Sequence, residues 1–170
     1  MSGSDSDMEI RDATVDDAPA IARIYNQGIE DRVATLETQP RTPEERAEWL
    51  AARGQRHPVL VAVDGNGTVL GWVSLNAFNP RPVYEHVADF SVYVARNQRG
   101  RGIGDALLGA VEARARGLGY HKLVLAGFPT NPAGMRLYER HGFSTVGIYR
   151  EQGQLDGRWV DVILMEKLLG

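Results

Sequence analysis

A glycine- and arginine-rich octapeptide, NQRGRGIG at residues 97–104, constrains the fold of this chain more than any other stretch. The run before it, VADFSVYVA, alternates apolar and polar side chains as a β-strand does, and apolar residues follow it at helical spacing. Glycine tolerates positive φ, so a turn here can direct backbone N–H groups toward a ligand. Arg99 and Arg101 add two cations. The stretch therefore predicts a strand, a turn and a helix that either hold an anion at the helix N-terminus or form an ordinary connection.

The rest of the chain alternates between strand-like and helix-like periodicity. We expect strands near residues 9–13, 58–63, 68–78, 87–95 and 122–128, two more around the turn LDGRW, and helices near residues 14–31, 42–53, 102–116 and 132–141. Because no full βαβ series is present, the pattern predicts a mixed α/β sheet. The length of 170 residues fits one domain over residues 9–170, after a polar leader at residues 1–8 that we expect to be disordered.

Composition excludes several classes of function. A formal net charge of −3 and a pI near 5.8 give no general affinity for nucleic acid or an anionic membrane. The absence of cysteine rules out disulfides, a thiolate nucleophile and cysteine metal sites, and none of the four histidines pairs with another at the spacing of a helical metal site. No stretch has the pattern of a secretory signal or a membrane span, so we expect a cytoplasmic protein without a metal.

The position of the glycines also argues against two nucleotide-binding folds. A dinucleotide-binding fold has its glycine fingerprint directly after the first strand, with an acidic residue about 20 positions later. In this chain the glycines come at mid-chain, and RGRGIG lacks the Gly-Lys-Ser/Thr ending of an NTP-binding loop. Neither of these two nucleotide-binding folds is therefore expected.

Two motifs together resemble the GNAT superfamily of N-acetyltransferases. RGRGIG at residues 99–104 is similar to the superfamily's diphosphate motif, Gln/Arg-x-x-Gly-x-Gly/Ala, and NPAGMRLYERHGF at residues 131–143 is similar to a second motif. The resemblance covers about residues 10–168. Three segments narrow the resemblance to one branch of the superfamily, the phosphinothricin N-acetyltransferases and, more closely, the arsinothricin N-acetyltransferases. These segments are IYNQGIEDRVATLETQPRTPEE, RPVYEHVADFSVYV and DGRWVDVILMEKLL.

This resemblance implies a GNAT fold, with a mixed, mostly antiparallel central sheet that is splayed near its middle and flanked by about four helices. It implies acetyl-CoA as the donor, the α-amino group of a glutamate-like amino acid with a tetrahedral acid as the acceptor, and a homodimer. Two alternatives stay open. In the first, the acceptor is methionine sulfoximine, methionine sulfone or a protein N-terminus. In the second, the chain is a non-catalytic module that binds acetyl-CoA.

The expected cofactor site joins the octapeptide to the preceding strand. Backbone N–H groups at the helix N-terminus would bind the diphosphate, and the strand would offer main-chain groups to the pantetheine arm. The expected cofactor-binding residues are Val92, Tyr93, Val94, Arg99, Gly100, Arg101, Gly102, Ile103, Gly104, Asp105 and Asn131. Since the Asp105 carboxylate would repel a diphosphate, we expect its side chain to point away.

The resemblance points to two catalytic residues. Asp89 stands where the phosphinothricin enzymes have glutamate, so it is expected to take the amine's proton directly or through an ordered water; the alternative is a structural carboxylate. Its strand places Asp89, Ser91 and Tyr93 on one face and apolar residues on the other. Tyr138 stands where the superfamily protonates the departing thiolate, and its alternative is an aromatic packing role.

Acceptor recognition and assembly are the last expectations. Arg81 and Tyr84 match positions that contact the acid groups of phosphinothricin, although NPRPVYEH also fits a proline-stiffened loop that carries a solvated arginine. Trp159 lies in the terminal hairpin, which supports a homodimer in this branch. Burial of Trp159 in the core is the simpler account.

Overall fold

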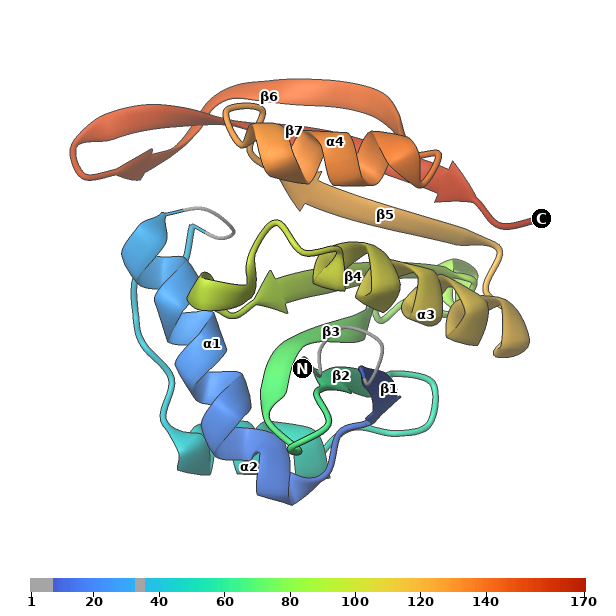
Figure 1. Cartoon of the computed structure of the whole chain (residues 1–170). Helices are drawn as coiled ribbons and strands as arrows, with labels where there is room; N and C mark the ends of the chain where they lie inside the picture. Colours follow the sequence, from blue (N-terminus) through green and yellow to red (C-terminus); the bar gives the residue numbers. More distant parts are fainter. Residues whose placement is uncertain (1–7, 33–35) are drawn as a thin grey trace.

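The computed structural model describes residues 8–32 and 36–170 (Figure 1). The expected disordered leader, residues 1–8, therefore lies outside the described residues except for its last position, as does part of the segment between the first two helices. The described residues form one seven-stranded sheet in the order β1-β2-β3-β4-β5-β7-β6. Its strands are β1 Glu9–Asp12, β2 Val59–Val63, β3 Val69–Ala77, β4 Val87–Val94, β5 Lys122–Gly127, β6 Ser144–Leu155 and β7 Arg158–Leu168.

Four α-helices flank this sheet in the described part of the chain: α1 Ala18–Asp31, α2 Pro43–Ala51, α3 Ile103–Gly117 and α4 Pro132–Arg140. A capping box closes the N-terminus of α2: the Thr42 hydroxyl accepts from the Glu45 N–H at 3.0 Å, and the Glu45 carboxylate accepts from the Thr42 N–H at 2.9 Å. The expected first helix instead starts with a 3₁₀ turn, Val15–Asp17, before α1 begins. Asp17 accepts from the Thr14 N–H at 2.8 Å and so closes that turn.

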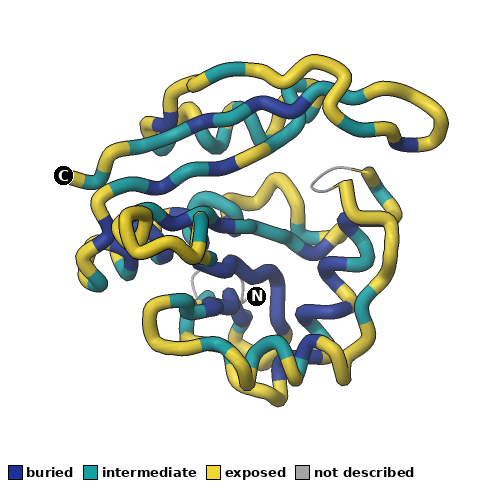
Figure 2. The backbone as a smooth tube through the Cα atoms, turned by 180° about the vertical axis from the view of Figure 1, so that it is seen from behind, coloured by how far each residue is buried: buried dark blue, intermediate teal, exposed yellow. Residues whose placement is uncertain are grey.

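Alternating side chains of the strands build two apolar clusters, one on each face of the sheet. Leu60 and Ala62 of β2 pack with the buried stripe of α3, whereas Val59, Val61 and Val63 of the same strand pack with α1. Figure 2 shows the buried residues concentrated in the strands at the centre of the molecule. The two faces of β4 follow the same rule, as the sequence predicts: its apolar residues face α3 and Tyr93 joins the α1 cluster.

The sheet separates near its middle. β4 and β5, the parallel pair among the described strands, are in register only over Val87–Asp89 and Lys122–Val124. Beyond these residues the two strands diverge (Figure 1), although β4 stays paired with β3 as far as Val94. The remainder of β4 therefore presents backbone groups along one edge to a ligand rather than to a strand. The predicted splay is confirmed.

The terminal hairpin of β6 and β7 contradicts one expectation. Trp159 is 61% exposed, so the prediction that it is buried in the core is wrong. It pairs with Gln154 on the edge strand β6, and Ile148 and Tyr149 of that strand are also exposed, at 48% and 51%. The physical reason is position: α4 covers the hairpin near its base, and the strands extend beyond the helix (Figure 1).

Candidate active site

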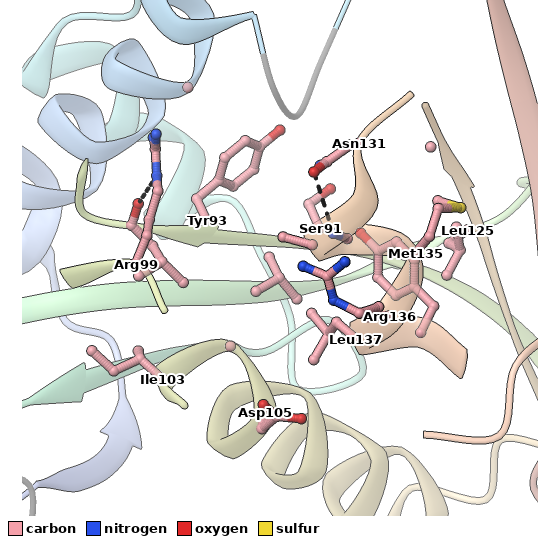
Figure 3. Close-up of a pocket in the computed structure, with 18 of the residues that line it drawn as sticks. Ser91, Tyr93, Arg99, Ile103, Asp105, Leu125, Asn131, Met135, Arg136 and Leu137 are labelled. Atoms are coloured by element: carbon pink, nitrogen blue, oxygen red, sulfur yellow. Dashed lines mark hydrogen bonds between the residues drawn. The ribbon is translucent and has the colours of Figure 1, made fainter. Parts of the chain in front are cut away.

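A groove of about 540 Å³ opens where β4 and β5 diverge (Figure 3). The exposed edge of β4, the glycine-rich turn, the end of β5 and α4 form its walls. The expected cofactor residues that line it are Val92, Tyr93, Val94, Arg99, Gly100, Gly102, Ile103, Gly104, Asp105 and Asn131. Arg101 is not among the lining residues, whereas Tyr138 and Arg136, the latter unforeseen from the sequence, both are.

The turn itself has the backbone geometry of an anion site. Gly100 and Gly102 have φ values of +80° and +82°, and a Cβ at either position would meet no described atom within 4 Å. Glycine is thus required here by the backbone conformation rather than by crowding. The Ala106 N–H donates to the Gly102 carbonyl at 3.1 Å and opens the hydrogen-bond ladder of α3. The preceding N–H groups of the turn are therefore left for a ligand, at the positive end of the helix dipole.

The Arg99 side chain is directed toward α1 (Figure 3). Its Nη1 donates to Asp31 at 2.8 Å, and the same carboxylate accepts from Arg96 at 2.9 and 3.0 Å. These hydrogen bonds, the one from Arg96 above all, lower the pKa of Asp31. Arg99 and Arg96 together tie the turn to the C-terminal end of α1. Direct contact of the Arg99 guanidinium with an anion stays a prediction.

The Asp105 carboxylate is held by α4. Arg140 donates to it at 2.9 and 3.2 Å, and His141 Nε2 lies 3.2 Å from Oδ1. The hydrogen bonds from Arg140 and His141 lower the pKa of Asp105 despite partial burial. The pairing joins the first turn of α3 to the end of α4 and offsets the negative charge that Asp105 places beside the turn.

Asp89 stands at the point where the sheet separates, because it is the final residue of β4 in register with β5. Burial raises the pKa of its carboxyl group, and a hydrogen bond from Asn76 Nδ2 at 3.1 Å opposes that rise. Arg53 Nη2 donates to Asn76 Oδ1 at 2.8 Å, which sets the amide with its N–H₂ toward Asp89. Burial, with a further contribution from Arg46, lowers the pKa of Arg53 to about 10. Sequence spacing gave no signal for this Arg53–Asn76–Asp89 chain, because Arg53 lies in the α2–β2 connection, Asn76 on β3 and Asp89 on β4.

Tyr138 of α4 packs against two aromatic rings from the sheet side of the groove. Its ring centroid lies 6.1 Å from that of Phe90 and 6.3 Å from that of Phe143. Burial raises its pKa, so the phenol keeps its proton at neutral pH. The packing role and a proton-donor role are therefore compatible.

A second cavity, of about 640 Å³, lies on the α1–α2 face of the sheet and meets the groove at Ser91 and Tyr93. Its lining consists of Tyr25, Glu37, Arg41, Glu45, Arg46, Glu48, Trp49, Trp72, Ser74, Asn76, Ser91 and Tyr93. Arg81 and Tyr84 line neither of these two cavities. Both are exposed on the β3–β4 connection, where the Tyr84 ring packs against Phe78 at 5.5 Å.

A model of the Acetyltransferase (GNAT) family matches residues 21–143. The chain belongs to this family. The matched segment runs from α1 to Phe143, the residue before β6, and so contains the splayed strands, the glycine turn and Tyr138. The expected GNAT fold is confirmed.

Known relatives of this GNAT enzyme are similar to it over nearly its whole length. It is 39% identical over 158 residues to the L-methionine sulfoximine/L-methionine sulfone acetyltransferase of Pseudomonas aeruginosa, with 92% of either chain covered. It is 31% identical over 167 residues to the phosphinothricin N-acetyltransferase of Streptomyces coelicolor, covering 96% of this chain and 98% of the relative. Its structure matches a GNAT superfamily phosphinothricin acetyltransferase from Sinorhizobium meliloti in complex with AcCoA, with a TM-score of 0.90 and 32% identity over 96% of this chain and 89% of that one.

The enzyme is therefore an N-acetyltransferase with acetyl-CoA as its cosubstrate, as expected. Within residues 8–32 and 36–170, no His, Cys, Asp or Glu cluster of three or more could hold a metal ion. No helix in the same residues is long and apolar enough to cross a membrane.

Proposed function

We propose that this GNAT enzyme acetylates the α-amino group of a free amino acid that resembles glutamate and carries a tetrahedral acid, as phosphinothricin and arsinothricin do. The observation that carries the proposal is the second cavity, which meets the cofactor groove at Ser91 and Tyr93. Its volume of about 640 Å³ suits a small acceptor. The names of the two relatives, a phosphinothricin and a methionine sulfoximine acetyltransferase, support an amino-acid acceptor. Acetylation of such a toxic analogue would confer resistance.

In this proposal the main chain holds the donor. The N–H groups of residues 100–105 bind the diphosphate at the start of α3, and residues 92–94 of β4 present their backbone to the amides of the pantetheine arm. Asn131 caps α4 by accepting from the Gly134 N–H at 3.3 Å, so its role toward the pantetheine would be added to a structural one. The acetyl group would then lie near Asp89, where β4 and β5 begin to diverge.

Transfer is direct. The acceptor nitrogen attacks the acetyl carbonyl carbon, and a C–N bond forms as the C–S bond breaks. Asp89 takes the proton of the amine directly or through an ordered water, and Tyr138 donates its proton to the departing thiolate. The raised pKa makes Asp89 a stronger base, and Tyr138 is protonated at neutral pH and so has a proton to donate. The chain has no cysteine for a thioester intermediate.

Methionine sulfoximine is a second candidate acceptor, and the 39% identity to the methionine sulfoximine/sulfone enzyme favours it. Recognition of the acceptor's acid group by Arg81 and Tyr84 stays a prediction, because both residues are exposed outside the two cavities.

A thiol-release assay tests the proposal. Phosphinothricin, arsinothricin, methionine sulfoximine, methionine sulfone, glutamate, polyamines and short peptides are compared by kcat/KM. We expect the tetrahedral glutamate analogues to lead. Preference for peptides or polyamines would contradict the acceptor class, and absence of turnover with every amine would favour a module that only binds acetyl-CoA.

We further propose that the enzyme is a homodimer of the cytoplasm that pairs through the β6–β7 hairpin. The exposed Ile148, Tyr149 and Trp159 of this hairpin support the interface, because exposed large apolar side chains are frequent at association surfaces. Sedimentation equilibrium should give twice the chain mass of 18.7 kDa, and a monomer at micromolar concentration would contradict it.

A further inference from the structure

Arg46 of α2 is a buried cation surrounded by aromatic rings. It is 8% exposed, and its Cζ lies 4.4 Å from the ring centroids of Tyr25 and Trp49 and 5.2 Å from that of Trp72. Burial lowers the pKa of its guanidinium. Its Nε is buried without a hydrogen-bond partner among the described residues. A solvent-exposed arginine on a helix would have none of these properties.

The neighbouring arginines show that this arrangement is unusual for the chain. Arg53, also packed on Trp49 at 4.4 Å, donates to the His57 carbonyl at 2.9 Å and to Asn76 Oδ1 at 2.8 Å. Arg41, at the rim of the second cavity, is paired with Glu37 at 3.0 Å and Glu45 at 3.7 Å. A buried charge without such partners is costly, and aromatic faces replace only part of its hydration.

Arg46 lies in the wall of the second cavity, together with Asn76, the hydrogen-bond donor to Asp89. The cavity thus offers two different groups to an acceptor. Asn76 is hydrogen-bonded to the Asp89 carboxylate, which lines neither cavity but can receive the proton of an amine through this wall or an ordered water, and the Arg46 guanidinium forms no ion pair among the described residues. A free amino acid carries both complementary groups, an amine and at least one oxyanion.

We propose that Arg46 is the anchor that binds an oxyanion of the acceptor, its α-carboxylate or its side-chain acid, and so selects acidic amino acids over simple amines. The inference rests on the proposed acceptor class. A guanidinium fork can donate two parallel hydrogen bonds to such a group, and its aromatic surroundings exclude competing water. The same surroundings hold the fork in place before the acceptor arrives.

The test compares Arg46→Met, which keeps an apolar chain of similar length, with Arg46→Lys, which keeps the charge without the fork. Three acceptors are used: the glutamate analogue, its decarboxylated amine, and its counterpart with a neutral side chain. In R46M the KM for the full analogue should rise roughly 10- to 100-fold, with a smaller rise in R46K. The acceptor that lacks the oxyanion held by Arg46 should keep its wild-type KM, which identifies that oxyanion.

Arg56→Gln is the matched control, because the Arg56 guanidinium also lies over an aromatic ring, 4.3 Å from the centroid of Tyr120, but lines neither cavity; its KM values should change less than about 3-fold. Acetyl-CoA affinity measured by calorimetry should be unchanged in all variants, which shows that they are folded. If R46M does not fold, R46K alone provides the test: its KM for the oxyanion-bearing acceptor should rise, by less than the rise expected for R46M. An equal loss for all three acceptors, or no loss for any, would overturn the proposal.

Tryptophan fluorescence separates this inference from the proposed function. Trp49 and Trp72 flank Arg46, so binding of phosphinothricin itself should change their emission in the wild type and not in R46M. If the wild type turns over no amino acid yet shows this Arg46-dependent signal, the anchor stands and the acceptor class fails. If it turns over the analogue and R46M does so equally well, the acceptor class stands and the anchor is wrong.

Discussion

Replacing Gly102 by valine would separate the backbone requirement of the glycine turn from its role in binding. Gly102 has a φ of +82°, and a Cβ built there has no described neighbour within 4 Å. A side chain at this position would therefore strain the backbone without a steric clash. Left-handed geometry costs a non-glycine residue roughly 1–2 kcal/mol. For a domain of this size, that loss lowers the unfolding temperature by roughly 2–8 °C. The variant should therefore remain folded at 20 °C.

The same side chain would project where the diphosphate is expected to approach the turn. Loss of one hydrogen bond to a charged group costs about 1.5–3 kcal/mol, which is roughly a 10- to 150-fold loss in affinity. Isothermal titration calorimetry with coenzyme A at constant salt measures this loss directly. The KM for acetyl-CoA should rise by a similar factor.

Gly119 supplies the matched control. It has a φ of +87° and likewise no described atom within 4 Å of a built Cβ, but it follows the opposite end of α3. A 15-residue helix is about 22 Å long, so a side chain there is remote from the groove. Gly119→Val should lose similar stability and bind coenzyme A as the wild type does. If Gly102→Val binds as tightly as Gly119→Val, the diphosphate is not held at this turn.

Three substitutions test the groups around the acetyl group and the turn. Asp89→Asn should lower kcat/KM by about 10²- to 10⁴-fold. Because the folded-state pKa of Asp89 is raised, the Asp89 carboxyl group stabilises the folded protein at acid pH, and this stabilisation is lost as the pH rises through that pKa. The Asp89→Asn variant should therefore be more stable than the wild type at pH 7–8. Identical melting curves of the two proteins across pH would contradict this burial effect. Tyr138→Phe should lower kcat by about 10²-fold with unchanged coenzyme A affinity, and an unchanged kcat would assign the tyrosine to packing alone. Asp105→Asn should tighten coenzyme A binding by about 2- to 5-fold at low salt and less at high salt, whereas weaker binding would show that the bridge to Arg140 shapes the turn.

Local sequence signals were enough for the elements that position the cofactor site. The two-residue alternation of β4 and the glycines of the turn each predict backbone geometry within a few residues. Resemblance to the GNAT motifs added the order in which these elements form a splayed sheet. Alternation by itself says nothing about where β4 and β5 part, which depends on pairing between distant strands.

Long-range contacts account for what the sequence left out. Arg99 was expected at an anion, yet its partner Asp31 lies 68 positions earlier in the chain. On α2, Arg46 follows two glutamates and has the pattern of a solvated residue; only the packing of Tyr25 and Trp72 around it shows that it is buried. Trp159 was misjudged for the opposite reason, since an apolar residue on a strand does not show whether a second layer covers it.

A crystal structure with coenzyme A and the N-acetylated product tests the central claim most directly. The account predicts the diphosphate on the N–H groups of residues 100–105, the pantetheine along residues 92–94, and the sulfur beside Tyr138 with the product amide near Asp89. Coenzyme A bound away from the start of α3, or a sulfur remote from both side chains, would contradict it.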